Sequence, residues 1–452
     1  MNFISLTFVF LFPVVLCLYF VVPGKYQKLL LLVASYVFYL QESSYAGLLL
    51  VFTTLFTYMA GRAIERSSHK KAWLLAAAVV CIGLLIGLKY TVPPVGISFY
   101  TFQTLSYVID VYRGEIPAEK DLFTYALFVA FFPQLVAGPI ERAGDLLGQL
   151  KQVHTVHTHE LADGCFLLLR GFYKKVVVAD HLAVYVDRVY AAPQQAGGPG
   201  VIFGTVCFAI QIYCDFSGYT DIARGAAGMM GIRLMENFRH PYRAVNIQDF
   251  WRRWHISLTK WFTDYIYVPL GGSRKRPVRH CLNVLFIFLL SGFWHGAALH
   301  YVIWGLLHGV YMVFFLLWRR LFPAKQEGAH PVVGWLVTML LVDIAWVFFR
   351  APSVGMAWTV LKQPFVHPAG DGLSALLSFL GLSGKTVFAL FVILLSWGVL
   401  EQIPEKVTEQ IWTKKRLYLA AAVFVGMVTV IEFSWLSMMA AGGENAFLYF
   451  RF

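Results

Sequence analysis

Charged residues are scarce in this sequence. They make up 14% of its 452 residues, whereas 58% are hydrophobic. Soluble domains carry about a quarter charged residues and about half apolar ones, so this composition is typical of a chain surrounded mostly by lipid. A hydrocarbon core about 30 Å thick needs roughly 20 apolar residues per helix, and on that rule the chain could supply about ten spans or more. The composition therefore predicts an all-α, polytopic integral membrane protein.

Motifs of several soluble classes are also missing. The sequence contains no P-loop, no dinucleotide-binding fingerprint and no G-x-S-x-G nucleophile motif. Its six cysteines form no C-x-x-C pair, so we expect small core residues rather than disulfides. His154, His157 and His159 have loose metal-ligand spacing, but their polar loop offers no carboxylate–His–Cys set, so we expect no metal. The net charge of +12 comes from basic residues between apolar segments, which indicates cytoplasmic loops near anionic lipid rather than nucleic-acid binding.

The apolar residues fall into separate segments. Several are shorter than a full span, and the stretch 95–112 contains Tyr and Ser, which suits re-entrant or tilted helices buried within protein. The first segment is too long for a signal peptide and lacks a cleavage site, so we expect a membrane span there. The apolar segments lie near 3–22, 29–40, 46–60, 73–88, 122–137, 164–180, 200–214, 281–295, 298–318, 333–349, 386–402 and 417–438.

Basic residues in the short loops predict the orientation. Loop 23–28 carries two lysines and loop 61–71 carries four basic residues, whereas loop 41–44 carries a single glutamate. The positive-inside rule then places the first and third loops in the cytoplasm and the N-terminus outside. Basic runs at 274–279 and 414–416 mark further cytoplasmic loops, and the final helix would leave the C-terminus outside.

Two histidines are the strongest candidates for chemistry. His255 lies in FWRRWHISLTKWFTDYIYVPLGGSR (250–274) and His295 in the apolar LLSGFWHGAALHYVIWGLLHG (289–309). An ionisable group inside a span is costly, so His295 is a candidate site residue, with a core histidine bonded to a carbonyl as the alternative. Gly292 and Gly296 favour the site, because small residues let another chain or a substrate approach.

The depth of His295 follows from helix geometry. If its helix starts near Leu282, His295 lies roughly 20 Å along it at 1.5 Å per residue, past the middle of the bilayer. A neutral imidazole in such a low-dielectric site is a good general base. It would take the proton from a hydroxyl that attacks a thioester carbonyl.

Other residues are candidates with two interpretations each. Asp215 and Tyr219 could orient a donor or the histidine, or they could form a polar cluster at a helix end. Arg252 and Arg253 could bind donor phosphates or anchor an interfacial helix on anionic lipid. His308 follows His295 by 13 residues, about 220° around a helix, so both would face one pore only if the helix breaks between them.

The motifs resemble a known enzyme family. Residues 210–272 and 290–309, with their WRRWHIS and WHG blocks, resemble the signature core of the membrane-bound O-acyltransferases, closest to the branch that acetylates alginate, peptidoglycan and cellulose. Shorter matches extend the resemblance over nearly the whole chain and are VGISFYTFQTLSYVIDVYRGE (95–115), FFPQLVAGPIER (131–142), LRGFYKKVVVADHLA (169–183), WVFFRAPS (346–353) and the terminal FLYFRF.

The resemblance implies a fold and a function. The fold would be one polytopic domain over 1–452, with its signature core at about 95–310 and a ring of transmembrane and re-entrant helices around a central funnel. His295 would be catalytic, and His255 the second site residue. The enzyme would hold no bound cofactor, take acetyl from cytoplasmic acetyl-CoA and pass it across a bacterial inner membrane to a polysaccharide, through an extracytoplasmic SGNH-type acetyltransferase partner.

Two other functions remain open at this point. One is D-alanyl transfer to teichoic acid from a carrier-protein thioester, which stays within the enzyme class. The other is a glycan transporter or flippase. The absence of an evident internal repeat and the paired WHIS and WHG blocks count against the transporter.

Overall fold

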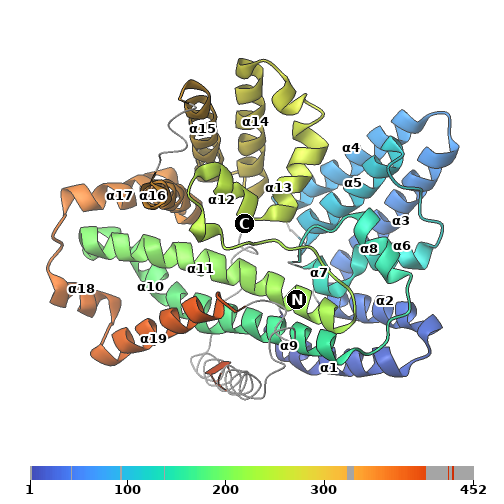
Figure 1. The fold of residues 1–452 in the computed structure, drawn as a ribbon, viewed down its shortest axis with the longest axis horizontal. Helices are drawn as coiled ribbons and strands as arrows, with labels where there is room; N and C mark the ends of the chain where they lie inside the picture. Colours follow the sequence, from blue (N-terminus) through green and yellow to red (C-terminus); the bar gives the residue numbers. More distant parts are fainter. Residues whose placement is uncertain are drawn as a thin grey trace. The chain divides into compact units, whose positions relative to one another are not determined.

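The computed structural model describes residues 3–41, 43–91, 94–136, 138–322 and 330–403, with three further positions at 426, 430 and 431. Every regular element in these ranges is a helix, and the ranges contain no strand (Figure 1). The all-α prediction is confirmed. The predicted span 417–438, apart from those three positions, lies outside the described residues, as do the basic loop 414–416 and the terminal FLYFRF.

Several helices are long and apolar enough to cross a membrane. A bent pair, α18 (Leu373–Leu380) and α19 (Gly384–Leu400), adds one more span if its two halves, which meet at 76°, are taken together. The described residues thus contain six candidate spans, or seven with the bent pair, as a polytopic membrane protein requires. The six are α3 (Ser44–Arg66), α4 (Lys70–Lys89), α11 (Pro193–Met229), α14 (Pro277–His295), α15 (Leu299–Leu321) and α16 (Pro331–Arg350).

The chain divides into two compact units. The first comprises residues 1–172 and 218–236, and the second residues 173–217 and 237–403, together with parts of the C-terminal region. Besides α3, α4 and the end of α11, the first unit contains α1 (Leu6–Val21), α2 (Gly24–Leu40), α5 (Ile97–Arg113), α6 (Leu122–Ala130), α7 (Phe132–Leu135), α8 (Ala143–Leu150) and α9 (Thr158–Phe172).

Helix α5 forms the core of the first unit. It packs against α3 and α4, and nearly all its residues are buried, as expected for the Tyr- and Ser-containing stretch 95–112. The Gln103 and Gln134 amides exchange two hydrogen bonds of 3.0 Å, and Gln103 also donates to the carbonyl of Phe128 at 2.8 Å. That carbonyl lies just before the break between α6 and α7. The broken backbone is therefore satisfied inside the protein, which is the condition for irregular structure at membrane depth.

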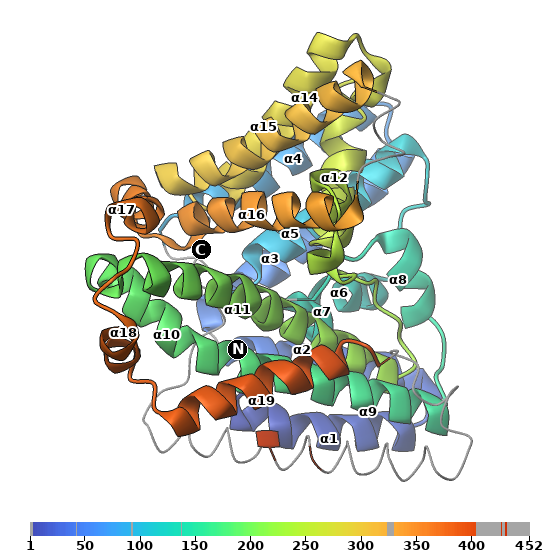
Figure 2. The same cartoon turned by 60° about the vertical axis from the view of Figure 1, so that its left-hand side comes forward.

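The second unit carries both candidate histidines. Its centre is the hairpin of α14 and α15, against which α16 and α12 pack (Figure 2). Besides α14–α16, α18, α19 and most of α11, the second unit contains the π-helical η1 (Tyr173–Ala179), α10 (Asp180–Ala191), η2 (Pro241–Arg243), α12 (Ile247–Arg253), α13 (Ile256–Phe262), η3 (Thr263–Tyr267), η4 (Gly272–Arg274) and α17 (Val354–Val366).

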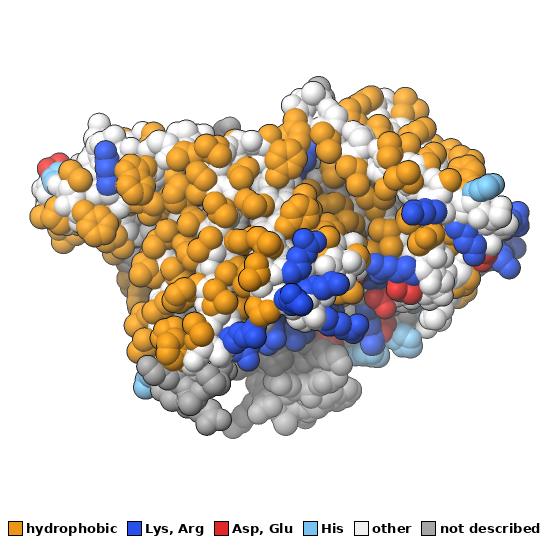
Figure 3. Space-filling model, turned by 90° about the horizontal axis from the view of Figure 1, so that it is seen from above, with side chains coloured by type: hydrophobic (Ala, Val, Ile, Leu, Met, Phe, Trp, Pro, Cys, Tyr) orange, Lys and Arg blue, Asp and Glu red, His pale blue; other side chains and the backbone are white. Residues whose placement is uncertain are grey.

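Large apolar side chains cover much of the surface. Figure 3 shows hydrophobic side chains over most of one face, with Lys and Arg gathered in one region of it. Leu48 on α3, Leu75 on α4, Phe314 on α15 and Leu340 on α16 are each exposed by more than 60%. Exposed apolar area on this scale would aggregate in water, whereas it matches the hydrocarbon region of a bilayer.

The predicted orientation can be tested across α3, whose ends are marked by Ser43 and Ser68, both exposed. We expect single cysteines at these positions, in a cysteine-free background, to be labelled from opposite sides of intact cells. An impermeant maleimide should modify the Ser43→Cys variant and leave Ser68→Cys unmodified until the membrane is opened. Equal labelling of both variants in intact cells would refute the orientation.

Candidate active site

His295 is the last residue of α14. The helix begins at Pro277, five residues before the expected Leu282, so His295 lies about 27 Å along it rather than 20 Å. The expected helix start near Leu282 is corrected accordingly. Proline at the first helical position explains the earlier start, since its missing N–H is not needed there. The C-terminal end of a helix carries partial negative charge, which stabilises the positive charge that an imidazole gains with a proton.

Glycines let α15 approach α14 at this end. A Cβ atom added at Gly292 would lie 2.5 Å from the carbonyl oxygen of Tyr301, and one at Gly305 would lie 2.3 Å from that of Phe288. A Cβ at Gly296 would meet the ring of Tyr301 at 2.2 Å. The predicted close approach at Gly292 and Gly296 is therefore present. The neighbour is the chain's own next helix, because both positions are filled by α15.

The imidazole of His295 lies among aromatic rings. It meets Trp304 edge-on at 4.9 Å between ring centroids, and Phe349 edge-on at 5.2 Å. Trp304 comes from α15 and Phe349 from α16, so three helices enclose the ring. His295 is buried, as expected for a histidine in a low-dielectric site.

His255 occupies a special backbone position between α12 and α13. Its φ of 45° and ψ of 53° lie in the left-handed region, which non-glycine residues visit at a cost of about 1–2 kcal/mol. Hydrogen bonds donated to Asn237 hold this turn. The carbonyl oxygen of Asn237 accepts from the N–H of Ile256 at 2.9 Å, and its side-chain Oδ1 accepts from the N–H of Ser257 at 3.2 Å.

The same amide fixes the tautomer of His255. Because the backbone N–H of Ser257 donates to Oδ1 of Asn237, that atom is an acceptor, and Nδ1 of His255 must donate to it at 3.1 Å. The lone pair of the neutral ring then resides on Nε2. Burial lowers the pKa of His255, which lies outside the six candidate spans, to about 3, so the ring is neutral at pH 7.

One indole contacts both histidines. The ring centroid of Trp294 lies 4.6 Å from that of His295 and 6.4 Å from that of His255. The ring of Phe216 on α11 meets His255 edge-to-face, at 4.8 Å between ring centroids. Two histidines 40 positions apart in the sequence thus belong to one aromatic cluster within the second unit.

The helix breaks between His295 and His308, the condition under which both were expected to face one site. Residues 296–298 form the turn, and α15 runs back along α14. Trp304 meets His308 at 5.1 Å between ring centroids, while its contact with His295 is 4.9 Å. His308 therefore extends the aromatic cluster along α15.

The remaining candidates lie on α11 and α12. Arg252 is exposed, and Arg253 donates to Asp249 at 2.8 Å one turn earlier in α12. Asp215 forms an ion pair of 2.7 Å with Lys175. Tyr219 belongs to the first unit, where it is buried and its ring lies 5.8 Å from Phe3. The donor-binding role of these four residues remains a prediction.

A buried ion network near Asp215 was not foreseen from the sequence. Lys175, in η1, is paired with Asp180 as well as with Asp215, each at 2.7 Å. The adjacent Lys174 pairs with Glu401 at 2.7 Å, and Glu401 accepts from the hydroxyl of Tyr213 at 2.9 Å. Buried ions require such pairing, because removing one partner strands a charge in a low dielectric. This network ties α10, α11 and the end of α19 to η1.

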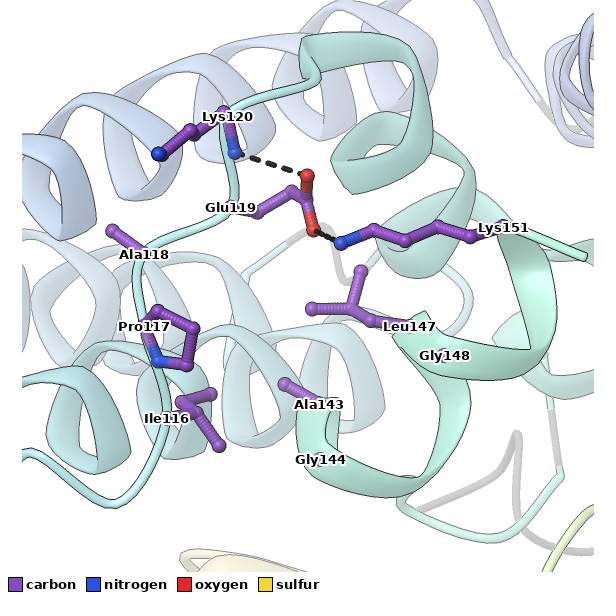
Figure 4. Close-up of a pocket in the computed structure, with 10 residues that line it drawn as sticks. All are labelled: Ile116, Pro117, Ala118, Glu119, Lys120, Ala143, Gly144, Leu147, Gly148 and Lys151. Atoms are coloured by element: carbon purple, nitrogen blue, oxygen red, sulfur yellow. Dashed lines mark hydrogen bonds and ion pairs between the residues drawn. The ribbon is translucent and has the colours of Figure 1, made fainter.

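A pocket of about 440 Å³ lies elsewhere, in the first unit (Figure 4). The loop at 116–120 and helix α8 line it, and the ion pair between Glu119 and Lys151, at 2.6 Å, crosses one side. None of the sequence-predicted site residues lines this pocket. It does not alter the assignment of the candidate site to the histidine cluster.

The family of this chain follows from its similarity to known proteins. The model of the membrane-bound O-acyltransferase family matches residues 115–358, a segment that contains both histidines, Asn237 and Trp294. The chain belongs to this family. As a membrane-bound O-acyltransferase it is an enzyme, and the resemblance found in the WHIS and WHG blocks is confirmed.

Proteins with similar sequences are named for different acceptors. The probable alginate O-acetylase AlgI of Pseudomonas aeruginosa is 40% identical over 399 residues, covering 81% of this chain and 75% of the relative. The peptidoglycan O-acetyltransferase of Helicobacter pylori is 33% identical over 386 residues, 75% of this chain and 73% of the relative. The teichoic acid D-alanyltransferase of Bacillus subtilis is 30% identical over 237 residues, 50% of this chain and 60% of the relative.

Asn237 is a site residue that sequence reasoning missed. It lies in MENFRHP, inside the 210–272 block, but a single asparagine in a polar loop carries no spacing signal. Its importance emerges only from the fold, which places it against His255. The same is true of Trp304, which appears in the sequence as one of many aromatic residues.

The support of His255 by Asn237 can be tested by substitution. We expect Asn237→Ala to lower acyl transfer strongly and to lower Tm, because it strands the N–H of Ser257 and releases the imidazole, at a cost of about 1–3 kcal/mol. Ser257→Ala is the matched control: it removes one hydrogen bond, from Oγ to Asn237 at 2.9 Å, and leaves His255 held. Equal activity in the two variants would show that the amide does not orient His255.

Proposed function

We propose that this protein is an O-acetyltransferase of a bacterial inner membrane that takes acetyl from cytoplasmic acetyl-CoA and delivers it to an extracytoplasmic polysaccharide. The observation that supports it most is the aromatic cluster in which His295 and His255 both contact Trp294. It brings two imidazoles into one water-poor site at the end of a membrane helix. The relatives named for acetylation of alginate and of peptidoglycan align over three quarters or more of the chain.

In the proposed reaction His295 is the general base. Its ring takes the proton of an attacking hydroxyl as that oxygen forms a bond to the thioester carbonyl carbon. The carbon–sulfur bond then breaks, and the imidazolium returns the proton to the leaving thiolate. The C-terminal end of α14 stabilises the imidazolium in between. Atoms and charge balance, because the hydroxyl and the thioester become an ester and a thiol.

His255 has a supporting role in this proposal. Its Nδ1 is occupied by Asn237, so the lone pair on Nε2 is the one that could accept from a substrate or an intermediate. A ring fixed in this way is preorganised for one hydrogen bond, and preorganised polar groups stabilise charge that develops in the transition state. We expect it to position the acetyl group rather than to take the proton.

Arginines at the open end of the hairpin favour a phosphate-bearing donor. Arg252 is exposed on α12, and Arg319 at the end of α15 donates to Gln248 of the same short helix at 3.0 Å. The basic residues of 274–279 lie just before α14 and in its first turn, at the same end of the antiparallel hairpin. Coenzyme A carries several phosphate charges, which guanidinium groups bind well. The phosphopantetheine arm of a carrier protein carries a single phosphate charge.

Acetyl transfer is preferred to D-alanyl transfer for a second reason. The D-alanyltransferase relative aligns over half of the chain, whereas the alginate acetylase relative aligns over 81% of it. The acceptor lies outside the cell in this proposal, and an extracytoplasmic SGNH-type acetyltransferase would complete the transfer to the polymer. Membrane lipid is the other partner.

The role of His295 is tested with purified protein in detergent or nanodiscs. We expect His295→Ala to lower acetyl transfer from acetyl-CoA about 10²–10⁴-fold, the usual contribution of a general base, with Tm near that of the wild type. His255→Ala should reduce the rate less. A well-folded His295→Ala protein that transfers acetyl at the wild-type rate would contradict the proposal.

A further inference from the structure

His308 lies on the buried face of α15, one turn beyond Trp304, and no solvent reaches its side chain. Its ring is nearly parallel to Phe250 at 6.3 Å and stands edge-on to Trp251 at 5.0 Å and to Trp304 at 5.1 Å. Trp346 of α16 lies 6.2 Å away. Aromatic rings from α12, α14, α15 and α16 thus enclose one imidazole.

Four polar atoms in this aromatic cage have no hydrogen-bond partner in the described part of the chain. There, neither Nδ1 nor Nε2 of His308 has a hydrogen-bond partner, and the same holds for Nε1 of Trp251 and Nε1 of Trp304. Buried polar groups in folded proteins are nearly always paired, because leaving a donor or acceptor unsatisfied is costly. Four unpaired polar atoms on three rings in mutual contact indicate a bound ligand rather than four separate hydrogen bonds lost on folding.

His300 provides the contrast on the same helix face. It lies two turns before His308, and its Nδ1 lies 3.0 Å from the carbonyl oxygen of Phe348, to which it donates. A hydrogen bond to a backbone carbonyl is the usual way in which a buried histidine pairs its N–H group. His308 does not adopt it, although α16 also passes beside its ring.

The donor and acceptor pattern limits what the cage can bind. A neutral imidazole offers one donor and one acceptor, and each indole offers one donor. Because the two nitrogens of an imidazole point away from each other, one small group meets only one of them, and a group that donates to the lone-pair nitrogen can also accept from an indole N–H. A hydroxyl group does both, whereas a carboxylate cannot donate and an ammonium cannot accept. The three rings are in direct contact, with centroids about 5–6 Å apart, so the bound group lies at their polar edges and must be small.

We infer that His308, Trp251 and Trp304 form a buried site for a small hydroxyl-bearing group, either water or the hydroxyl of the acceptor, beside His295. The site adjoins the proposed base because Trp304 contacts both histidines. His308 is then a positioning residue, which acts on His295 through Trp304 and the bound hydroxyl. The expected effect on the rate rests on the proposed function, whereas the existence of the site does not.

Two substitutions of His308 test the site. His308→Gln keeps one hydrogen-bond donor and one acceptor. His308→Leu keeps a similar side-chain volume but has neither a donor nor an acceptor. We expect His308→Leu to lower acetyl-transfer turnover about tenfold or more, and His308→Gln to stay within about threefold of the wild type. The Tm of His308→Leu should equal or exceed that of the wild type, because an apolar side chain suits the aromatic cage.

The kinetic pattern identifies the source of the hydroxyl. If the site holds an ordered water, His308→Leu lowers kcat and leaves the KM for the acceptor unchanged. If it holds the acceptor's own hydroxyl, that KM rises. A cryo-EM map of the wild-type protein should show density for a small molecule within hydrogen-bond distance of His308 in either case.

His300→Leu is the matched control for a structural histidine. It should lower Tm, because it strands the buried carbonyl of Phe348. The inference is overturned if His308→Leu lowers Tm as His300→Leu does, if it keeps wild-type turnover, or if His308→Gln fails as completely as His308→Leu. Should the wild type transfer no acetyl, the proposed function fails, whereas the Tm comparison and the density at His308 still decide the existence of the site.

Discussion

The close approach of α14 and α15 is the constraint on which the candidate site depends. Gly292 and Gly305 place the two backbones where no side chain could fit between them. This contact sets Trp304 directly against His295 at the end of α14, and it aligns His308 on the same face of α15. In lipid, where apolar burial between helices gains little, such backbone contact through small residues is a main source of helix association.

A second constraint is that polar groups inside the membrane protein must find partners within it. Asn237 satisfies the strained turn at His255, and Gln103 satisfies the break after α6. The buried ammonium group of Lys175 is likewise paired, with the carboxylates of Asp180 and Asp215. The polar atoms around His308 find no such partner among the described residues, and they gather on three rings in mutual contact, which is why they point to a bound molecule.

Much of the fold was predictable from composition and apolar segments. The helices α3, α4, α14, α15 and α16 each lie over an expected segment, because apolar runs of this length have one stable form in a bilayer. Their ends were harder to predict. Pro277 extends α14 toward the basic loop, so the helix begins five residues before its expected start near Leu282.

The site was predictable in its histidines and not in their surroundings. His255 and His295 stood out because ionisable residues in apolar segments are rare and costly. Asn237, Trp304 and Glu401 could not be found that way, since their roles arise from long-range contacts that no local spacing encodes. Asp215 was found as a candidate, and the structure shows its ion pair with Lys175, which sequence spacing alone did not indicate.

The central claim is that the acetyl group crosses the membrane through this histidine site while coenzyme A stays on the cytoplasmic side, since moving even one charge to the bilayer centre costs several kcal/mol. Sealed vesicles of known orientation test it most directly. Inside-out vesicles given labelled acetyl-CoA should transfer the label to an acceptor enclosed in the lumen, whereas right-side-out vesicles given the same donor outside should not. Equal transfer in both orientations would contradict the account.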